Sequence, residues 1–509
     1  MLSVAMLLGA TAREHPGRAA VIDDLGGPAG GARRVTYAEL DERSARVAAL
    51  LVSAGIAPGD RVAMTCPNSA WFPVVYYGIL KAGAVVVPIN VLLRAPEVAA
   101  TLVDSGARAY FCDDGDGTRP SEGRIGYGAA PGCTRFFGIG PELDGLLAGL
   151  PPLRDYHPTE PADPAVILYS SGTTGTPKGA RLTHANLVLN TVAVARLYGT
   201  AEHDVHLVAA PLSHILGQSV QMNFAFATGA TLVPMPRFDP ARAASLMAEH
   251  RVTFFAGVPT MYWTLAETCE EPALAAACAH LRVALSGGAP LSAALMDRYR
   301  ERYGVQLLEG YGLSEAGTAV SVSPQDGPRA PAGTIGKPVW GVDLRLVGED
   351  GEEAADGEVG EIVLRGPCVM AGYQDRPEET AAVLRDGWFR TGDLARRDAD
   401  GFYFIVDRVK NMILRGGYTV YPREIEDRLA AHPAVGLAVV VGVPDEKYGE
   451  EIKAVVVRRQ GAEVTAEELL AWGREGLAAH KYPRIIEFRD AVPLNSTGKV
   501  IRNSLRYRL

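Results

Sequence analysis

The feature that most constrains the fold of this chain is an alternation of short apolar segments with helical segments. The apolar segments occupy residues 61–64, 84–88, 206–210, 230–233, 253–256 and 282–286. Helical patterns, such as those at 241–250 and 292–303, lie between them. This alternation is typical of α/β proteins, in which helices cover largely parallel sheets. Ligands of such sheets bind beyond the carboxyl ends of the strands, so the loops at these ends are candidate site regions.

The chain is too long for one compact domain. Its 509 residues exceed what a single hydrophobic core normally supports, so at least two domains are expected. The pattern becomes β-rich after residue 338, with segments at 342–347, 360–365 and 402–406. A new unit begins near Tyr421, with apolar strands at 437–443 and 454–457. The sequence therefore predicts a large α/β domain of layered sheets with a β-rich subdomain, followed by a small α+β domain.

Three local patterns near the N-terminus make further predictions. A capping box at Thr36 and Glu39 predicts a helix that extends to Gly55. The apolar start at 1–12 lacks an early basic residue and is short, so it favours an amphipathic helix packed on the body over a signal peptide. The Gly/Asp-rich stretch 115–131 is expected to be an irregular surface excursion.

Composition and charge exclude several classes of protein. With 48% hydrophobic and 21% charged residues, the chain has the composition of an ordinary globular protein. A formal net charge of −9 argues against a nucleic-acid partner, which calls for a basic surface. The six cysteines lack metal-like spacing and are expected to be reduced thiols of a cytoplasmic enzyme. No apolar run is long enough for a transmembrane segment.

The loop at 169–179, which reads YSSGTTGTPKG, directly follows an apolar strand. Glycines let backbone N–H groups approach a polyphosphate, hydroxyls add donors, and a lysine adds positive charge. The loop lacks the Gly-Lys-Ser/Thr triplet of a Walker A motif. A flexible linker is the alternative, but linkers rarely follow a buried strand directly. The candidate nucleotide contacts are Ser170, Ser171, Gly172, Thr173, Thr174, Gly175, Thr176 and Lys178.

Six later stretches, in order, complete a pattern that covers essentially the whole chain. They are 211–214 (PLSH), 286–290 (SGGAP), 311–315 (YGLSE), 390–393 (RTGD), 407–410 (DRVK) and 495–499 (NSTGK). Together with the loop, these stretches resemble the adenylate-forming superfamily of acyl-CoA synthetases, adenylation domains and luciferases, and most of all an acyl-CoA synthetase. The resemblance implies ATP, Mg²⁺ and coenzyme A as cofactors. It also implies that residues 1–406 bind ATP and the acyl substrate, that 407–410 form a hinge, and that 411–509 form a mobile domain.

The resemblance assigns catalytic roles to four residues. In the reaction, a carboxylate must attack the α-phosphate of ATP, so the site needs cations and hydrogen-bond donors aimed at that phosphate. Lys499 is expected to bridge the two negatively charged groups, and Glu315 to bind Mg²⁺. His214 is expected to act as a gate near the acyl pocket and the thiol entry, although an isolated histidine is more often a packed core group. Lys410 matches the hinge position.

Other residues are expected to bind the nucleotide and the pantetheine arm. Tyr311 would stack on adenine, and Asp393 would bind the ribose hydroxyls with help from Arg408. Core packing of the Tyr311 ring and a solvated turn at Asp393 are the structural alternatives. Gly416 and Gly417 would give pantetheine a path without side chains, and the basic residue before them, Arg415, fits a nucleotide-thiol partner. A two-glycine turn that ends a strand is the structural alternative for the glycines. The remaining candidates are Gly287, Gly288, Ala289, Pro290, Gly312 and Ser314, where the family usually has threonine.

Several alternatives stay open at this level. An acyl carrier protein is the alternative acceptor to coenzyme A, and a luciferase-type oxygenase shares the same framework. A non-catalytic nucleotide sensor is disfavoured because Lys178, Glu315 and Lys499 are all present. The stretches 255–262, 286–290 and 309–312 contain no lysine or arginine, which favours a hydrophobic monocarboxylic acid over malonate-like acids. Whether the chain forms a homodimer is left open.

Overall fold

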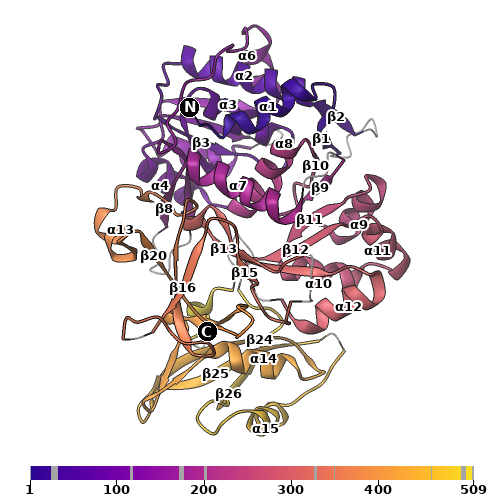
Figure 1. The fold of residues 1–509 in the computed structure, drawn as a ribbon, viewed down its shortest axis with the longest axis vertical. Helices are drawn as coiled ribbons and strands as arrows, with labels where there is room; N and C mark the ends of the chain where they lie inside the picture. Colours follow the sequence, from indigo (N-terminus) through magenta and orange to yellow (C-terminus); the bar gives the residue numbers. More distant parts are fainter. Residues whose placement is uncertain are drawn as a thin grey trace. The chain divides into compact units, whose positions relative to one another are not determined.

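In the computed structural model (Figure 1), the chain consists of two compact units. The larger unit holds Met1–Asp343 and Leu364–Phe389, and the smaller unit holds Leu344–Val363 and Arg390–Leu509. The structure describes residues 2–24, 32–114, 119–170, 177–199, 203–289, 291–325, 330–348, 350–459, 461–493 and 500–506. The hinge placed at 407–410 from the sequence stays a prediction.

The larger unit contains a nine-stranded and a seven-stranded sheet, both largely parallel as predicted. The first takes the order β15 (Lys337–Pro338), β14 (Thr318–Val322), β13 (Leu307–Leu313), β12 (Val283–Gly287), β11 (Phe254–Gly257), β9 (Val205–Val208), β10 (Thr231–Pro234), β1 (Ala19–Asp23) and β2 (Arg33–Thr36). The second takes the order β18 (Gly372–Tyr373), β8 (Lys178–Thr183), β7 (Pro164–Ser170), β4 (Val85–Ile89), β3 (Arg61–Thr65), β5 (Ala109–Asp113) and β6 (Arg135–Ile139). The predicted apolar segments are therefore central strands.

Helices cover both faces of the nine-stranded sheet because its strands alternate apolar side chains between the faces. Phe255 of β11 belongs to one hydrophobic core with residues of α9 (Pro240–Glu249), α10 (Pro259–Thr268), α11 (Glu271–Cys278) and α12 (Ala293–Tyr303). Its neighbour Phe254 faces α7 (His184–Tyr198), α8 (Phe224–Thr228) and the π-helix η1 (Leu216–Asn223). The remaining helices of this unit are α1 (Ala5–Glu14), α2 (Tyr37–Ser53), α3 (Trp71–Lys81), α4 (Ala95–Ser105), α5 (Glu122–Gly128), α6 (Pro141–Ala148) and α13 (Pro377–Val383).

The local predictions near the N-terminus met different outcomes. The capping box at Thr36 is formed and opens α2, and α1 buries Leu8 against the body. The prediction of an irregular stretch at 115–131 is wrong where α5 lies. A Cβ atom on Gly123 would lie 2.3 Å from the Cys112 Sγ, and one on Gly126 would lie 2.7 Å from the Ala95 carbonyl oxygen. These glycines therefore serve close helix packing rather than an irregular backbone.

The smaller unit is an α+β structure. Its sheet takes the order β23 (Tyr418–Val420), β22 (Ile413–Arg415), β25 (Gly449–Arg458) and β24 (Val435–Asp445), and β26 (Ile485–Phe488) pairs with β25. The helices α14 (Pro422–Ala430) and α15 (Ala466–Gly476) pack against this sheet through Ile425, Leu429 and Leu469. Apart from this sheet, residues 343–408 contribute strands to a further sheet, which takes the order β16 (Asp343–Val347), β17 (Val359–Arg365), β20 (Trp388–Arg397) and β19 (Leu384–Arg385), with β21 (Tyr403–Arg408) beside β20.

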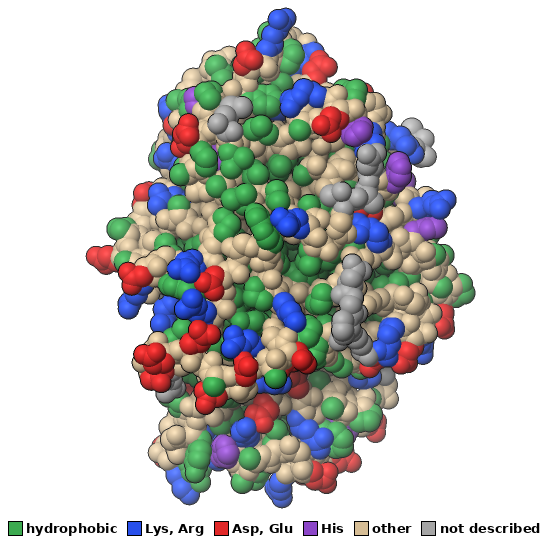
Figure 2. All heavy atoms as spheres, in the orientation of Figure 1, with side chains coloured by type: hydrophobic (Ala, Val, Ile, Leu, Met, Phe, Trp, Pro, Cys, Tyr) green, Lys and Arg blue, Asp and Glu red, His purple; other side chains and the backbone are tan. Residues whose placement is uncertain are grey.

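The surface charges, the cysteines and the hydrophobicity of the helices can be compared with the predictions from composition. On the face drawn in Figure 2, basic and acidic side chains are intermixed, and the described residues there form no basic stripe. All six cysteines are free thiols. Among the described helices, none has the length and apolar character needed to cross a bilayer.

Candidate active site

Glu315 lies at the tip of a tight β-hairpin. Strands β13 and β14 are antiparallel, Leu313 pairs with Thr318, and the turn between them holds Glu315. The hairpin closes so tightly that a Cβ atom on Gly312 would lie 1.4 Å from the Thr318 carbonyl oxygen. Gly312 is therefore required by the backbone, whatever its role toward a nucleotide.

Tyr373 orients the Glu315 carboxylate. The Tyr373 hydroxyl donates a hydrogen bond of 3.2 Å to Oε1 of Glu315, and the Met370 N–H donates to the Glu315 carbonyl oxygen at 2.8 Å. Burial, together with the nearby Glu315 carboxylate, raises the pKa of the Tyr373 hydroxyl. The hydroxyl therefore stays protonated and remains a donor to Glu315.

Lys178 lies near the ring of the same tyrosine. Tyr373 of β18 pairs with Ala180 of β8, the strand that begins at Lys178. The Lys178 Nζ is 5.4 Å from the centre of the Tyr373 ring and 3.5 Å from Oε2 of Glu379. The fold thus brings the loop lysine and the Glu315 carboxylate together, which the sequence had predicted only as separate motifs. A carboxylate and an ammonium group so placed fit Mg²⁺ and the oxygens of a polyphosphate.

Sequence reasoning missed Tyr373. The segment that carries it is held by Asn186, whose Nδ2 donates to the carbonyl oxygens of Pro367 and Val369 at 2.6 and 2.9 Å. The signal in the sequence is weak, since it consists of an aromatic residue directly after a glycine. In the structure Gly372 has a φ of +135°, and a Cβ atom added to it would lie 2.8 Å from the Thr380 side chain. Nothing in that short pattern indicates a carboxylate 58 residues earlier in the chain.

Replacing Tyr373 by phenylalanine should raise the Mg²⁺ concentration needed for half-maximal pyrophosphate exchange by about tenfold. The variant keeps the ring that packs by Lys178 but loses the hydrogen bond that orients Glu315. Tyr299→Phe is the matched control, because the Tyr299 hydroxyl donates to the Tyr262 carbonyl oxygen away from Glu315. Equal Mg²⁺ titrations for the two variants would contradict the role of Tyr373.

The predicted adenine contacts lie at the ends of two neighbouring strands. Gly287 of β12 pairs with Gly310 of β13, and Tyr311 follows directly. Gly288 has a φ of +81°, a conformation that favours glycine, and Ala289 is exposed. Tyr311 is partly buried, and its stacking on adenine stays a prediction.

His214 is held within its own segment. It is half-buried, its N–H donates to the Pro211 carbonyl oxygen at 2.9 Å, and its Nδ1 accepts the Leu216 N–H at 3.2 Å. The π-helix η1 begins at Leu216. Such helices are rare and are often found at functional sites.

In the smaller unit, Asp393 and Arg408 form an ion pair. They face each other across β20 and β21, and the Arg408 Nε is 2.6 Å from the Asp393 Oδ1. Asp393 is 3% exposed, so the alternative of a solvated turn aspartate is wrong. Lys410 is exposed in the short helix that follows β21.

The glycine pair of the smaller unit forms the turn between β22 and β23. Gly416 and Gly417 have φ values of +59° and +84°. Arg415, just before them, is buried and donates to both carboxylate oxygens of Glu451 at 2.6 and 2.8 Å. The interpretation of this arginine as a partner for a nucleotide thiol is therefore not supported, because its guanidinium already serves the fold.

Some predicted residues lie outside the described part of the chain. These are Ser171, Gly172, Thr173, Thr174, Gly175, Thr176, Pro290 and Lys499, together with the side chain of Ser170. Their predicted roles stay predictions.

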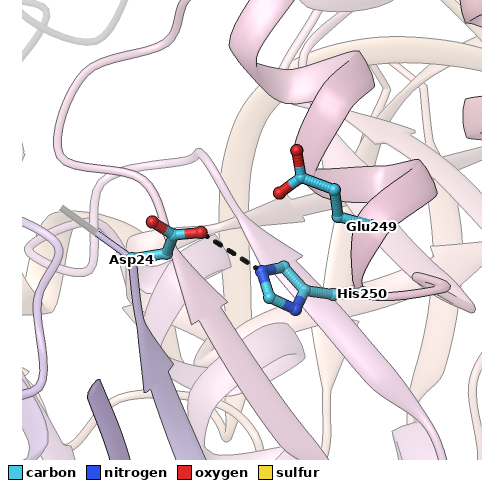
Figure 3. Close-up of side chains that lie close together, drawn as sticks. All are labelled: Asp24, Glu249 and His250. Carbon is cyan, nitrogen blue, oxygen red and sulfur yellow. Dashed lines mark hydrogen bonds and ion pairs between the residues drawn. The ribbon is translucent and has the colours of Figure 1, made fainter. Parts of the chain in front are cut away.

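A separate group of polar side chains lies elsewhere in the larger unit. Figure 3 shows Asp24, Glu249 and His250, with the His250 Nε2 3.4 Å from the Asp24 Oδ2. Arg242 lies 2.8 Å from the Asp24 carboxylate and 3.5 Å from that of Glu249. Because Arg242 already compensates the two negative charges, we interpret this group as an ion-pair cluster and not as a metal site.

Comparison with known proteins gives consistent matches over nearly the whole chain. The family model described as AMP-binding enzyme matches residues 8–374, and that of the AMP-binding enzyme C-terminal domain matches 424–499. A feruloyl-CoA synthase of Amycolatopsis sp. is 41% identical over 94% of this chain and 94% of its own length. A long-chain-fatty-acid–CoA ligase of Bacillus subtilis is 34% identical, covering 93% of this chain and 90% of that protein. The crystal structure of ATP-bound MatB from Rhodopseudomonas palustris matches with a TM-score of 0.91 and 34% identity, over 99% of this chain and 98% of its own.

Proposed function

Because this chain belongs to the AMP-binding enzymes and is an acid–thiol ligase that uses ATP, Mg²⁺ and coenzyme A, we propose that it activates a hydrophobic monocarboxylic acid as an acyl-adenylate and then forms the CoA thioester. The observation that supports this proposal is that Lys178 and Glu315 both lie beside Tyr373, Lys178 near its ring and Glu315 at its hydroxyl.

In the first half-reaction, a carboxylate oxygen of the acid attacks the α-phosphorus of ATP and pyrophosphate leaves. Lys178 would contact the phosphate oxygens, and Lys499 would bridge the acid and the α-phosphate. Glu315, oriented by Tyr373, would hold Mg²⁺. When bound, the ion neutralises triphosphate charge that the Glu315 carboxylate would otherwise repel.

In the second half-reaction, the thiol sulfur attacks the acyl carbonyl carbon and AMP leaves. We assign the gate near the acyl group to His214 and the pantetheine path to Gly416 and Gly417. Residues 1–406 would form the adenylation domain and 411–509 a mobile domain that turns about 407–410 between the two steps.

The acid is proposed to be hydrophobic for two reasons. The stretches 255–262, 286–290 and 309–312 contain no basic residue to pair a second carboxylate. The relatives are named for feruloyl-CoA and for long-chain fatty acids. Phe255 and Tyr262, which the sequence had placed at the pocket, are buried in the core, and the Tyr262 hydroxyl donates to the Phe255 carbonyl oxygen at 2.8 Å.

Pyrophosphate release across a panel of acids tests this function. The panel should contain arylpropenoic acids such as ferulate, long-chain fatty acids and malonate, with CoA or a holo acyl carrier protein as the acceptor. We expect turnover of a hydrophobic acid with CoA. Efficient turnover of malonate alone would contradict the proposed acid, and thioester formation only on the carrier protein would favour the alternative acceptor.

A further inference from the structure

Thr318, at the base of the Glu315 hairpin, has an unusual backbone conformation. Its φ is +119° and the residue is 7% exposed. A β-branched residue rarely adopts a positive φ, and such strain persists only where surrounding contacts hold it. The Thr318 carbonyl oxygen also occupies the space that a Cβ atom on Gly312 would need.

The Thr318 side chain reaches the segment that carries His214. Its Oγ1 donates a buried hydrogen bond of 3.1 Å to the Ile215 carbonyl oxygen. This carbonyl and the Leu216 N–H belong to one planar peptide group. The same N–H donates to the His214 Nδ1 at 3.2 Å. One peptide group therefore links the Thr318 hydroxyl to the His214 ring.

This link constrains the imidazole. Because Nδ1 accepts an N–H, it carries no proton, and the neutral ring holds its proton on Nε2. A hydrogen bond to the carbonyl side of a peptide group strengthens the donor on its nitrogen side. The hydroxyl also prevents the Ile215–Leu216 peptide from rotating away from the ring.

We propose that Thr318 is a positioning residue that fixes the orientation and tautomer of His214 through the Ile215–Leu216 peptide group. The hairpin that presents Glu315 thereby also orients His214, so the strained backbone at Thr318 serves two parts of the site. The effect on catalysis rests on the proposed function, in which His214 acts in thioester formation.

The test is a double-mutant cycle measured on each half-reaction in the full-length enzyme. Thr318→Val keeps the β-branched shape and removes the hydroxyl, and it should slow thioester formation from acyl-adenylate about five- to tenfold. Acid-dependent pyrophosphate exchange should change less than about twofold. Thr318→Ser should restore the thioester rate, and Thr318→Val should add less than about twofold in a His214→Ala background.

Thr191→Val is the matched control, because the buried Thr191 hydroxyl donates to the Leu187 carbonyl oxygen within α7. It should leave both half-reactions unchanged. The proposal would be overturned if Thr318→Val lowered the thioester rate by the same factor in the wild-type and His214→Ala backgrounds. It would also be overturned if Thr318→Val lowered the rates of both half-reactions equally. Thermal melting checks folding, and Thr318→Ala replaces the valine variant in the same cycle if that variant is unfolded.

An NMR measurement separates this inference from the proposed function. The imidazole ¹⁵N signals of His214, assigned by their loss in His214→Asn, should show an unprotonated Nδ1 in the wild type. Thr318→Val should move these signals toward a mixture of tautomers. Unchanged signals would overturn the link even in a fully active enzyme, whereas wild-type inactivity toward every acid would refute only the proposed function.

Discussion

Replacing Glu315 by glutamine should lower acid-dependent ATP–pyrophosphate exchange at saturating Mg²⁺ by about a hundredfold or more. The amide keeps the shape of the side chain and can still accept the Tyr373 hydroxyl, whose hydrogen bond to Glu315 is 3.2 Å long. Only the negative charge that would bind Mg²⁺ is lost. The loss of activity should therefore persist at saturating Mg²⁺, and the fold should be kept.

Glu379→Gln is the control for this prediction. Glu379 is a second carboxylate in the same region, 3.5 Å from the Lys178 Nζ, and its side chain is 42% exposed. We expect the exchange rate of the Glu379→Gln variant to stay within about threefold of the wild-type rate, because an exposed ion pair contributes little. Equal losses in Glu315→Gln and Glu379→Gln would show that general charge near the phosphates matters, and not a metal ligand.

Replacing Lys499 by alanine should reduce adenylate formation from acid and ATP by about a thousandfold. The reason is that the ammonium group would draw together two negatively charged reactants in the first half-reaction only. Thioester formation from a supplied acyl-adenylate should stay within about threefold, because that step has no α-phosphate transfer. The two rates are measured separately, by pyrophosphate exchange and by CoA consumption.

Lys481→Ala provides a matched lysine in the smaller unit. The Lys481 Nζ lies 2.7 Å from the Glu424 carboxylate, and the pair is partly exposed, so its loss should leave both rates unchanged. If Lys499→Ala reduced both half-reactions equally, the proposed division of roles between the two steps would be wrong.

Some features of the site could be predicted because their physical cause is local. The loop before Lys178 and the hairpin around Glu315 each combine glycines with polar side chains within a few residues. The apolar pattern at 282–286 predicted the strand at 283–287, and the fold pairs it with the strand at 307–313. Local patterns also misled, since the glycines at 123 and 126 indicated an irregular loop and instead allow a helix to pack closely.

Other features depend on contacts between residues far apart in the chain. Tyr373 matters because β18 adds to β8, which brings its hydroxyl to Glu315. Arg415 looked available for a ligand, but Glu451, which lies 36 residues away, engages its guanidinium in a buried ion pair. Neither the Tyr373–Glu315 hydrogen bond nor the Arg415–Glu451 ion pair can be recognised from a pattern within one segment of the sequence.

The sequence alone determined many of the strands and helices, the family resemblance and, through the motifs that carry this resemblance, the candidates Glu315, Lys178 and His214. The strands and helices depend on periodicity, caps and turn residues, which act over about a dozen residues. Only the tertiary structure decided that Tyr373 contacts Glu315 and that Thr318 reaches Ile215, 103 residues earlier. The physical reason is that such contacts depend on how sheets pair and pack, and this information is distributed over the whole chain.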